Sequence, residues 1–409
     1  MKRIILGLMV IFSLVFVACH KDDDVKFTSV QIKMQMPASL EGKNATMQNT
    51  VLTLTNVNSG VETTYNLGSA AIQSFDVEDG LYNILVLGKV QYTTKDAAGE
   101  EVSKTETVRA SHENVEVVGG MMNMDISLFL FKESSGFVIS EIFFAGTRTP
   151  ANKLYIGDAF IEIYNNTSEV LYADGLCIAE TEFLTSIFRY ELNPNIKDTH
   201  TAVARVYKIP GNGTEHAIQP GKVFLLCDQG IDHRIANPNS FDLSGAMFEW
   251  YDEGTKDPDV VEVENLIKIV SNSSSFWVPH NRGFSSYVLF KMDNVTPEQF
   301  NNEYVYTYNY KVLSGGIYLP KSSEAWKVPN EDIIDAVECS TPSAFEWKAL
   351  HASLDLSWTH SGDADNARYG KSVKRKVDRM EGERKILLDT NDSGFDFIPT
   401  ADPSPGIID

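Results

Sequence analysis

Four tyrosines at every second position are the clearest candidates for ligand contact in this sequence. These are Tyr304, Tyr306, Tyr308 and Tyr310. A β-strand would place all four rings on one face, where they could stack on sugars or on a planar ligand. Trp277 and Trp326 lie close by in the sequence and complete this candidate set. The alternative is that the rings fill a hydrophobic core.

A second candidate is a local basic run in an otherwise acidic chain. From Lys371 to Lys385 there are seven Lys and Arg residues against three acids. An anionic ligand or the acidic loop of a partner could bind the side chains of Lys374, Arg375, Lys376 and Arg379. The alternative is a solvated hairpin.

Motifs for hydrolysis, metal binding and nucleotide binding are absent from the sequence. It contains no G-x-S-x-G, H-E-x-x-H, C-x-x-C or P-loop pattern. We therefore predict a protein that is not an enzyme and that has no cofactor and no metal. Without residues 1–18 the chain has 33 Lys and Arg against 56 Asp and Glu, a charge of −23. A field of that sign argues against nucleic acid as a partner.

The N-terminus predicts export and lipid attachment. Lys2 and Arg3 precede an apolar run from Ile4 to Val17, which is the layout of a signal peptide. Ala18-Cys19 then resembles the lipobox of bacterial lipoproteins, which implies a signal peptide over 1–18, acylation of Cys19 and a lipidated tether over 19–26. The alternative is an ordinary signal peptide cleaved before a free cysteine.

A lysine and three aspartates follow the predicted lipid anchor at positions 21–24. This arrangement resembles the surface-export signal of Bacteroidetes lipoproteins. It implies an outer-membrane protein that faces the cell exterior. A solvated acidic tether is the alternative interpretation of the same residues.

The elements that must position the candidate residues are predicted to be strands. Short runs rich in Val, Ile, Thr, Tyr and Phe, separated by Gly, Asn, Asp and Pro, indicate an all-β protein. In the first block, residues 27–132, Val30–Met36 alternates with period two. The Asp79-Gly80-Leu81-Tyr82 turn between two strands resembles the prealbumin-like sandwiches, which implies a support domain.

The second block, residues 136–409, resembles the lamin-tail domain, an immunoglobulin-like sandwich. The opening strands carry matching residues at Glu141, Glu162, Tyr164, Asn165 and Gly175. Later segments follow the family order, namely Gln219-Pro220-Gly221, 333–337, 370–375, 389–393, 396–397 and 404–406. The block is much longer than such a domain, so we expect insertions at about 180–215 and 229–330. Loops of that size are often functional.

Two local details complete the predicted architecture. Cys177, Cys227 and Cys339 are an odd number of cysteines, which excludes a complete disulfide framework. Cys177 and Cys227 lie in apolar runs, which favours buried free thiols, and one disulfide between two of the three is the alternative. Thr296-Pro297 predicts the start of a short helix, with Thr296 as the N-cap and Pro297 in the first position.

The whole chain resembles a family of Bacteroides surface lipoproteins of similar length. Such proteins are commonly encoded beside TonB-dependent receptors. The resemblance implies a non-catalytic accessory or ligand-binding component of a TonB-dependent nutrient uptake system. Its cargo would be a glycan, which suits the tyrosine row, or an iron–siderophore complex, which suits the basic run. A structural or adhesive protein that binds other proteins is the first alternative, and a secreted hydrolase is the second.

Overall fold

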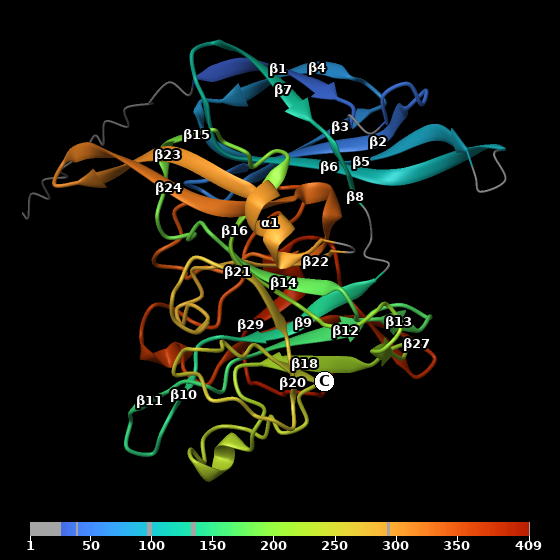
Figure 1. Cartoon of the computed structure of the whole chain (residues 1–409). Helices are drawn as coiled ribbons and strands as arrows, with labels where there is room; N and C mark the ends of the chain where they lie inside the picture. The colour runs from blue at the N-terminus through green and yellow to red at the C-terminus, as the bar shows by residue number, and fades with distance from the viewer. Residues whose placement is uncertain (1–25, 38–39, 96–99, 132–135, 293–294, 409) are drawn as a thin grey trace, which may run out of the picture.

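The computed structural model describes residues 26–37, 40–95, 100–131, 136–292 and 295–408 (Figure 1). Cys19 and residues 1–18 lie outside the described residues. The prediction of an all-β fold is confirmed, since the described elements are 29 strands, two short α-helices and a few 3-10 turns. Neither described helix has the length and apolar character needed to cross a bilayer.

Residues 27–131 form a sandwich of two sheets. The smaller sheet has the order β4-β1-β7, with β1 parallel to β7. The larger sheet has the order β3-β2-β5-β6-β8. The strands are β1 (Phe27–Gln35), β2 (Thr46–Asn56), β3 (Glu62–Gly68), β4 (Ile72–Glu78), β5 (Gly80–Lys95), β6 (Glu101–Val117), β7 (Met121–Ser127) and β8 (Phe129–Phe131). Alternate side chains of β1 are buried between the sheets, as its period-two pattern predicts.

The rest of the chain is built around two larger sheets. A seven-stranded sheet has the order β20-β19-β18-β12-β9-β26-β29, and its members are β9 (Phe137–Phe143), β12 (Phe160–Asn165), β18 (Val223–Cys227), β19 (Phe248–Glu249), β20 (Glu264–Asn265), β26 (Ser372–Arg375) and β29 (Phe397–Ala401). An eight-stranded sheet has the order β15-β23-β24-β16-β14-β22-β25, with β21 also paired to β16. Its members are β14 (Leu176–Thr181), β15 (Tyr190–Asn193), β16 (His200–Lys208), β21 (Ile267–Ser271), β22 (Tyr287–Lys291), β23 (Val305–Ser314), β24 (Ile317–Pro329) and β25 (Ile333–Val337).

Smaller elements complete this part. Three two-stranded pairs join β10 (Thr147–Arg148) to β11 (Leu154–Tyr155), β13 (Leu171–Tyr172) to β17 (Ala217–Ile218), and β27 (Val377–Glu381) to β28 (Arg384–Leu387). The helices are α1 (Pro297–Glu303) and α2 (Ser393–Asp396). The prediction of a helix start at Thr296 is confirmed, because Thr296 and Gln299 form a reciprocal capping box.

The segments that we expected to be insertions are part of the sheets. Residues 180–215 include β15 and β16, and residues 229–330 include β22, β23 and β24. Strands β12 and β14 are buried at every position, so both of their faces need apolar cover. The main core lies between the two large sheets, and further clusters involving α1 and the 241–246 loop cover their outer faces. The extra length therefore covers sheet faces that would otherwise be exposed.

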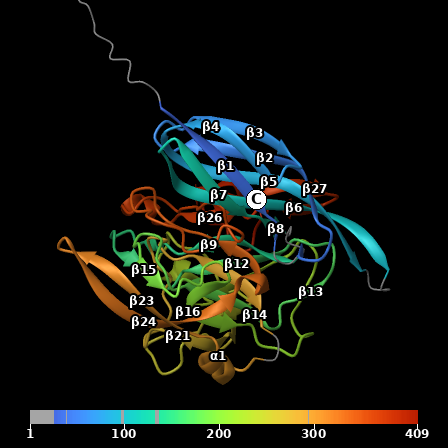
Figure 2. The same cartoon turned by 90° about the horizontal axis from the view of Figure 1, so that it is seen from above.

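The two parts of the molecule touch through β6, β8 and loops of the second part (Figures 1 and 2). The ring of Phe129 meets the ring of His351 edge-on, with centroids 4.5 Å apart. Arg109 of β6 is buried beside the charges of Asp396, Asp392 and Asp389. Burial lowers the pKa of Arg109 to about 10, and the carboxylates oppose this shift. An arginine of one part and acids of the other thus join the two parts.

Candidate binding sites

The tyrosine row lies on hairpin β23–β24, but half of it is buried. Tyr306 and Tyr308 are 3% and 1% exposed and pack with Phe183 in a small aromatic core. The hydroxyl of Tyr306 donates to the carbonyl of Pro194 at 2.6 Å, and that of Tyr308 donates to Glu182 Oε1 at 2.7 Å. Burial raises the pKa of Tyr306 to about 12. These two rings fill a core and are not available to a soluble ligand.

The other members of the aromatic set are dispersed. Tyr304 precedes the strand and stacks on Phe300, with centroids 4.7 Å apart. Tyr310 is half-buried under the guanidinium of Arg189. Trp277 is fully buried against Tyr207 in the main core. Trp326 is half-buried and donates its Nε1–H to Asn301 at 3.2 Å. The six rings therefore form no common platform.

The distal end of the same hairpin is exposed and apolar. We call Leu313, Ile317, Tyr318 and Leu319 the hairpin tip, and their side chains are between 37% and 61% exposed. Gly315 and Gly316 form the turn with positive φ values of 58° and 81°, which suit a two-residue type I′ hairpin. The hairpin extends beyond the body of the molecule (Figures 1 and 2). The tip thus presents side chains that a partner could cover.

The basic run does not form one anion site. Arg375 is buried, and its guanidinium lies 2.6 Å from Asp335, 3.1 Å from Asp389 and 3.8 Å from Asp396. Lys376 donates to the carbonyl of Phe395. Lys374 is half-buried, and exposed Arg379 pairs with Asp378 and Glu381. Successive side chains of β26 point to opposite faces of the sheet, and the chain turns after this strand. The four basic side chains therefore point in different directions.

A cleft of about 1970 Å³ lies between the two parts of the molecule. Segments from both parts line it, including residues 35–37 and 127–130 of the first and 170–172, 197–200 and 351–354 of the second. Aromatic side chains on its wall include Tyr172 and Phe188, which are 40% and 39% exposed. The sequence could not reveal this cleft, because residues far apart in the chain build its walls.

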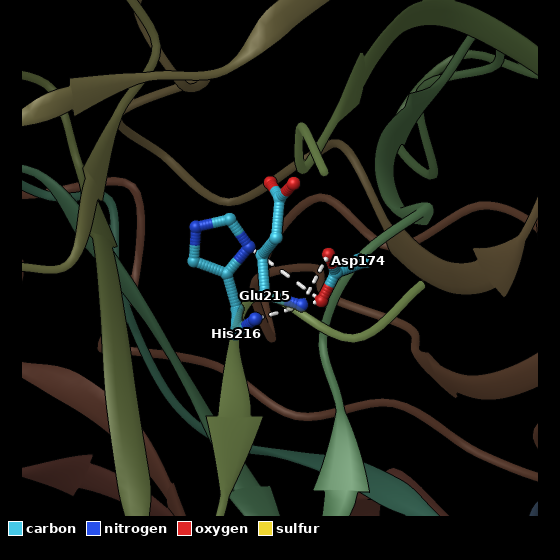
Figure 3. Close-up of side chains that lie close together, drawn as sticks. All are labelled: Asp174, Glu215 and His216. Atoms are coloured by element: carbon cyan, nitrogen blue, oxygen red, sulfur yellow. Dashed lines mark hydrogen bonds and ion pairs between the residues drawn. The ribbon is translucent and has the colours of Figure 1, made fainter. Parts of the chain in front are cut away.

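A third arrangement joins Asp174, Glu215 and His216 (Figure 3). Pairing of β13 with β17 brings the turn after β13 against the residues before β17. Each of the three residues offers a ligand atom, and these atoms lie within 4.8 Å of one another. Sequence analysis missed this group, since the acid and the histidine lie 42 positions apart and match no metal-binding spacing.

The Asp174 carboxylate also fixes the loop that carries its two neighbours. It accepts the backbone N–H groups of Gly213, Glu215 and His216 at 3.3, 3.0 and 2.9 Å. Burial alone would raise the pKa of Asp174, but these hydrogen bonds outweigh it and the pKa is lowered. Asp174 is therefore a fixed carboxylate at neutral pH.

Comparison with known proteins identifies a family pattern in part of the chain. Residues 219–404 match the model of a family described as a protein of unknown function (DUF4876). A crystal structure of a DUF4876 family protein from Bacteroides thetaiotaomicron has a TM-score of 0.54 and 21% identity, and the match covers 92% of this chain and 96% of that chain.

A second solved structure has a much lower similarity to this chain. An adhesin candidate from Bacteroides ovatus has a TM-score of 0.20 and 9% identity, over 78% of this chain and 88% of that chain. No curated protein matches this sequence. Residues 219–404 thus carry the DUF4876 pattern, and the chain shares its fold with a Bacteroides protein of that family.

Proposed function

We propose that this protein is a surface-exposed outer-membrane lipoprotein that acts as a non-catalytic accessory of a TonB-dependent uptake system and holds a glycan between its two parts. The observation that carries the proposal is the cleft of about 1970 Å³. The predicted lipid on Cys19 would anchor the chain, and the sandwich of residues 27–131 would form one wall of the binding site.

The size of the cleft favours an extended cargo. Pockets for compact small molecules measure roughly 300–1,000 Å³. A cleft of about 1970 Å³ has room for several sugar units. Clefts between domains are also a common place for ligands.

The charge of the lining favours a neutral cargo over an anionic iron–siderophore complex. Seven Asp and Glu residues and four Lys residues line the cleft. Asp335 is neutralised by Arg375, and Lys348 pairs with Glu338 at 2.9 Å. Six acids then remain against three lysines, and this excess would repel an anion. Exposed rings such as Tyr172 offer apolar faces on which a sugar can stack.

The glycan proposal is tested with a matched pair of tyrosine variants. The mature protein is applied to an array of oligosaccharides, and affinity for the best one is measured by calorimetry. We expect Tyr172→Ala, in the cleft wall, to weaken binding about 5-fold, since one stacking contact is worth about 1 kcal/mol. Tyr318→Ala, which removes an exposed ring outside the cleft, should leave the affinity unchanged. Absence of oligosaccharide binding, or equal effects of both variants, would contradict the proposal.

The exposed hairpin tip favours a second function, which is adhesion to or assembly with another protein. A chain of ring contacts runs outward from Trp347 through Phe188 and Tyr190 to Tyr318, with centroid distances of 5.4, 4.8 and 4.9 Å. These contacts support the tip from the body of the molecule. Tyrosine and large aliphatic side chains are frequent anchors of protein interfaces.

Side chains of the tip, not its backbone, would make such a contact. β16 pairs with β24 only at residues 326–329, so the outer edge of the distal strand is open. Pro320 and Lys321 stand on this edge, and proline and lysine discourage pairing with another strand. A protein partner would therefore cover Leu313, Ile317 and Tyr318.

A pull-down from solubilised outer membranes separates the two functions. The intact lipoprotein serves as bait, and co-purified proteins are identified by mass. Recovery of a TonB-dependent receptor would support the uptake role. Recovery of another protein, lost with Tyr318→Asp but kept with Tyr172→Ala, would support the adhesive role.

A further inference from the structure

The imidazole of His216 is held between two carboxylates. Its Nε2 lies 2.9 Å from Glu264 Oε2, and its Nδ1 lies 3.5 Å from Asp174 Oδ2. Nδ1 is buried, and among the described residues it has no hydrogen-bond partner. Because a carboxylate accepts a proton from Nε2, the neutral ring has its lone pair on Nδ1. That lone pair faces an oxygen of Asp174.

His216 Nδ1 and Asp174 Oδ2 are both hydrogen-bond acceptors and face each other, so a proton or a cation is needed between them. Asp174 is 1% exposed, and three backbone N–H groups hold its carboxylate in place. Gly211 allows this approach, because a Cβ at that position would lie within the Asp174 carboxyl group. Either a second proton on His216 or a bound cation would resolve the facing lone pairs.

Glu215 favours the cation. One oxygen of its exposed carboxylate lies within 4.8 Å of the ligand atoms of Asp174 and His216 and adds a third donor to the group. Its Oε1 accepts a hydrogen bond from Asn212 at 2.6 Å, and Figure 3 shows the three side chains together. A histidine nitrogen with two carboxylate oxygens suits Zn²⁺ and related transition ions, whereas Mg²⁺ and Ca²⁺ prefer oxygen alone.

The surroundings also resemble the outer shell of a metal site. Metal-bound histidines usually donate their other N–H to a carboxylate, which fixes the ring orientation. Glu264 stands in that position towards His216. Gly213 and Tyr172, which lie two positions before Glu215 and Asp174 in the sequence, line the cleft between the two parts. An ion bound here would lie at the border of the cleft with a coordination position left for solvent or cargo.

We propose that Asp174, Glu215 and His216 bind one divalent transition ion, with zinc as the best fit, and that Glu264 orients His216 for this purpose. The inference goes beyond glycan binding and does not depend on it. Its experiment has metal affinity as the readout, so its result is separate from that of the oligosaccharide test.

The experiment is calorimetric titration of the mature protein with ZnCl₂ at pH 7.5. We expect one zinc per chain. His216→Gln should weaken binding at least 100-fold, and Glu264→Gln should weaken it about 10- to 100-fold. His200→Gln, which changes a half-buried histidine elsewhere, should have no effect.

Three outcomes would overturn the proposal. One is the absence of stoichiometric zinc binding, and another is a His216→Gln variant with unchanged affinity. The third is a nitrogen NMR signature of a doubly protonated His216 that persists in excess zinc, since this means an imidazolium between two acids. Glu215→Gln changes only an exposed side chain, so it tests the ligand role if His216→Gln fails to fold, with at least a 10-fold loss expected.

Discussion

Two buried acidic clusters in the second part of the molecule differ in whether they contain a cation. In the arginine cluster, Asp335, Asp389 and Asp396 surround Arg375. In the aspartate cluster, Asp158, Asp228, Glu249 and Asp257 are buried close enough for their charges to repel one another. The residue types and the burial are alike. The comparison shows that buried carboxylates form ion pairs where a guanidinium lies among them and repel one another where their neighbours are acids.

The pKa values of Arg375 and Asp228 reflect the charges that surround each group. Burial opposes the charge of Arg375, but its three carboxylates outweigh burial and raise its pKa. In the aspartate cluster, burial and then the charges of Asp257 and Asp158 raise the pKa of Asp228 to about 8. Among the described residues no group donates a hydrogen bond to Asp228 Oδ1. Burial also raises the pKa of Asp335, to about 7, but the charge of Arg375 opposes that shift, whereas the neighbouring acids Asp257 and Asp158 add to the shift at Asp228.

Removal of Arg375 should have the largest effect on the stability of the folded protein. Arg375→Met would remove the guanidinium that pairs with these three buried carboxylates, and we expect a loss of about 3–5 kcal/mol in the free energy of unfolding. Denaturant unfolding at pH 7 measures it. Arg379→Met, which changes an exposed arginine of the same run, should alter stability by less than about 0.5 kcal/mol. Similar losses in both variants would mean that the arginine cluster is not the cause.

Loss of one carboxylate from the arginine cluster should have a smaller effect of the same sign. Asp335 accepts two hydrogen bonds from Arg375, at 2.8 and 2.6 Å, and one from the backbone of Ile139 at 2.6 Å. Asp335→Asn weakens charge-assisted hydrogen bonds, and we expect a loss of about 2 kcal/mol at pH 7. An equally stable Asp335→Asn protein would remove the distinction between the two clusters.

The same substitution in the aspartate cluster should have the opposite sign at alkaline pH. The folded pKa of Asp228 lies above its usual value, so its contribution to stability is fully present below about pH 4 and is lost as pH rises through 8. Asp228→Asn removes this titration, and we expect a gain of about 1 kcal/mol at pH 8.5 relative to wild type.

Melting curves from pH 5 to 9 provide the measurement for Asp228→Asn. The stability of the variant should fall less steeply with pH than that of wild type. Asp198→Asn, whose side chain is 91% exposed, is the control and should leave the slope unchanged. If the stability of Asp228→Asn fell with pH as steeply as that of wild type, Asp228 would already be ionised in the folded protein.

Local sequence patterns determined the fold class and several local structures. Alternation along β1 and the Thr296-Pro297 helix start required only neighbouring residues, and both were predicted. The prediction of three buried free thiols is confirmed among the described residues, because an apolar strand environment is a local property. The lipid anchor at Cys19 and the prealbumin-like and lamin-tail resemblances remain predictions.

The tertiary structure alone decided which candidate residues are accessible. The alternation of residues in the sequence predicted that Tyr306 and Tyr308 lie on one face of a strand. That face is buried because the 182–194 segment, including Phe183, packs against it. Arg375 belonged to a basic run in the sequence, yet its partners Asp335 and Asp396 come from other elements. The cleft and the Asp174–Glu215–His216 group likewise join residues far apart in the chain. Sequence patterns report the neighbours of a residue along the chain, whereas burial, counter-charges and ligand sets depend on the strands packed against it.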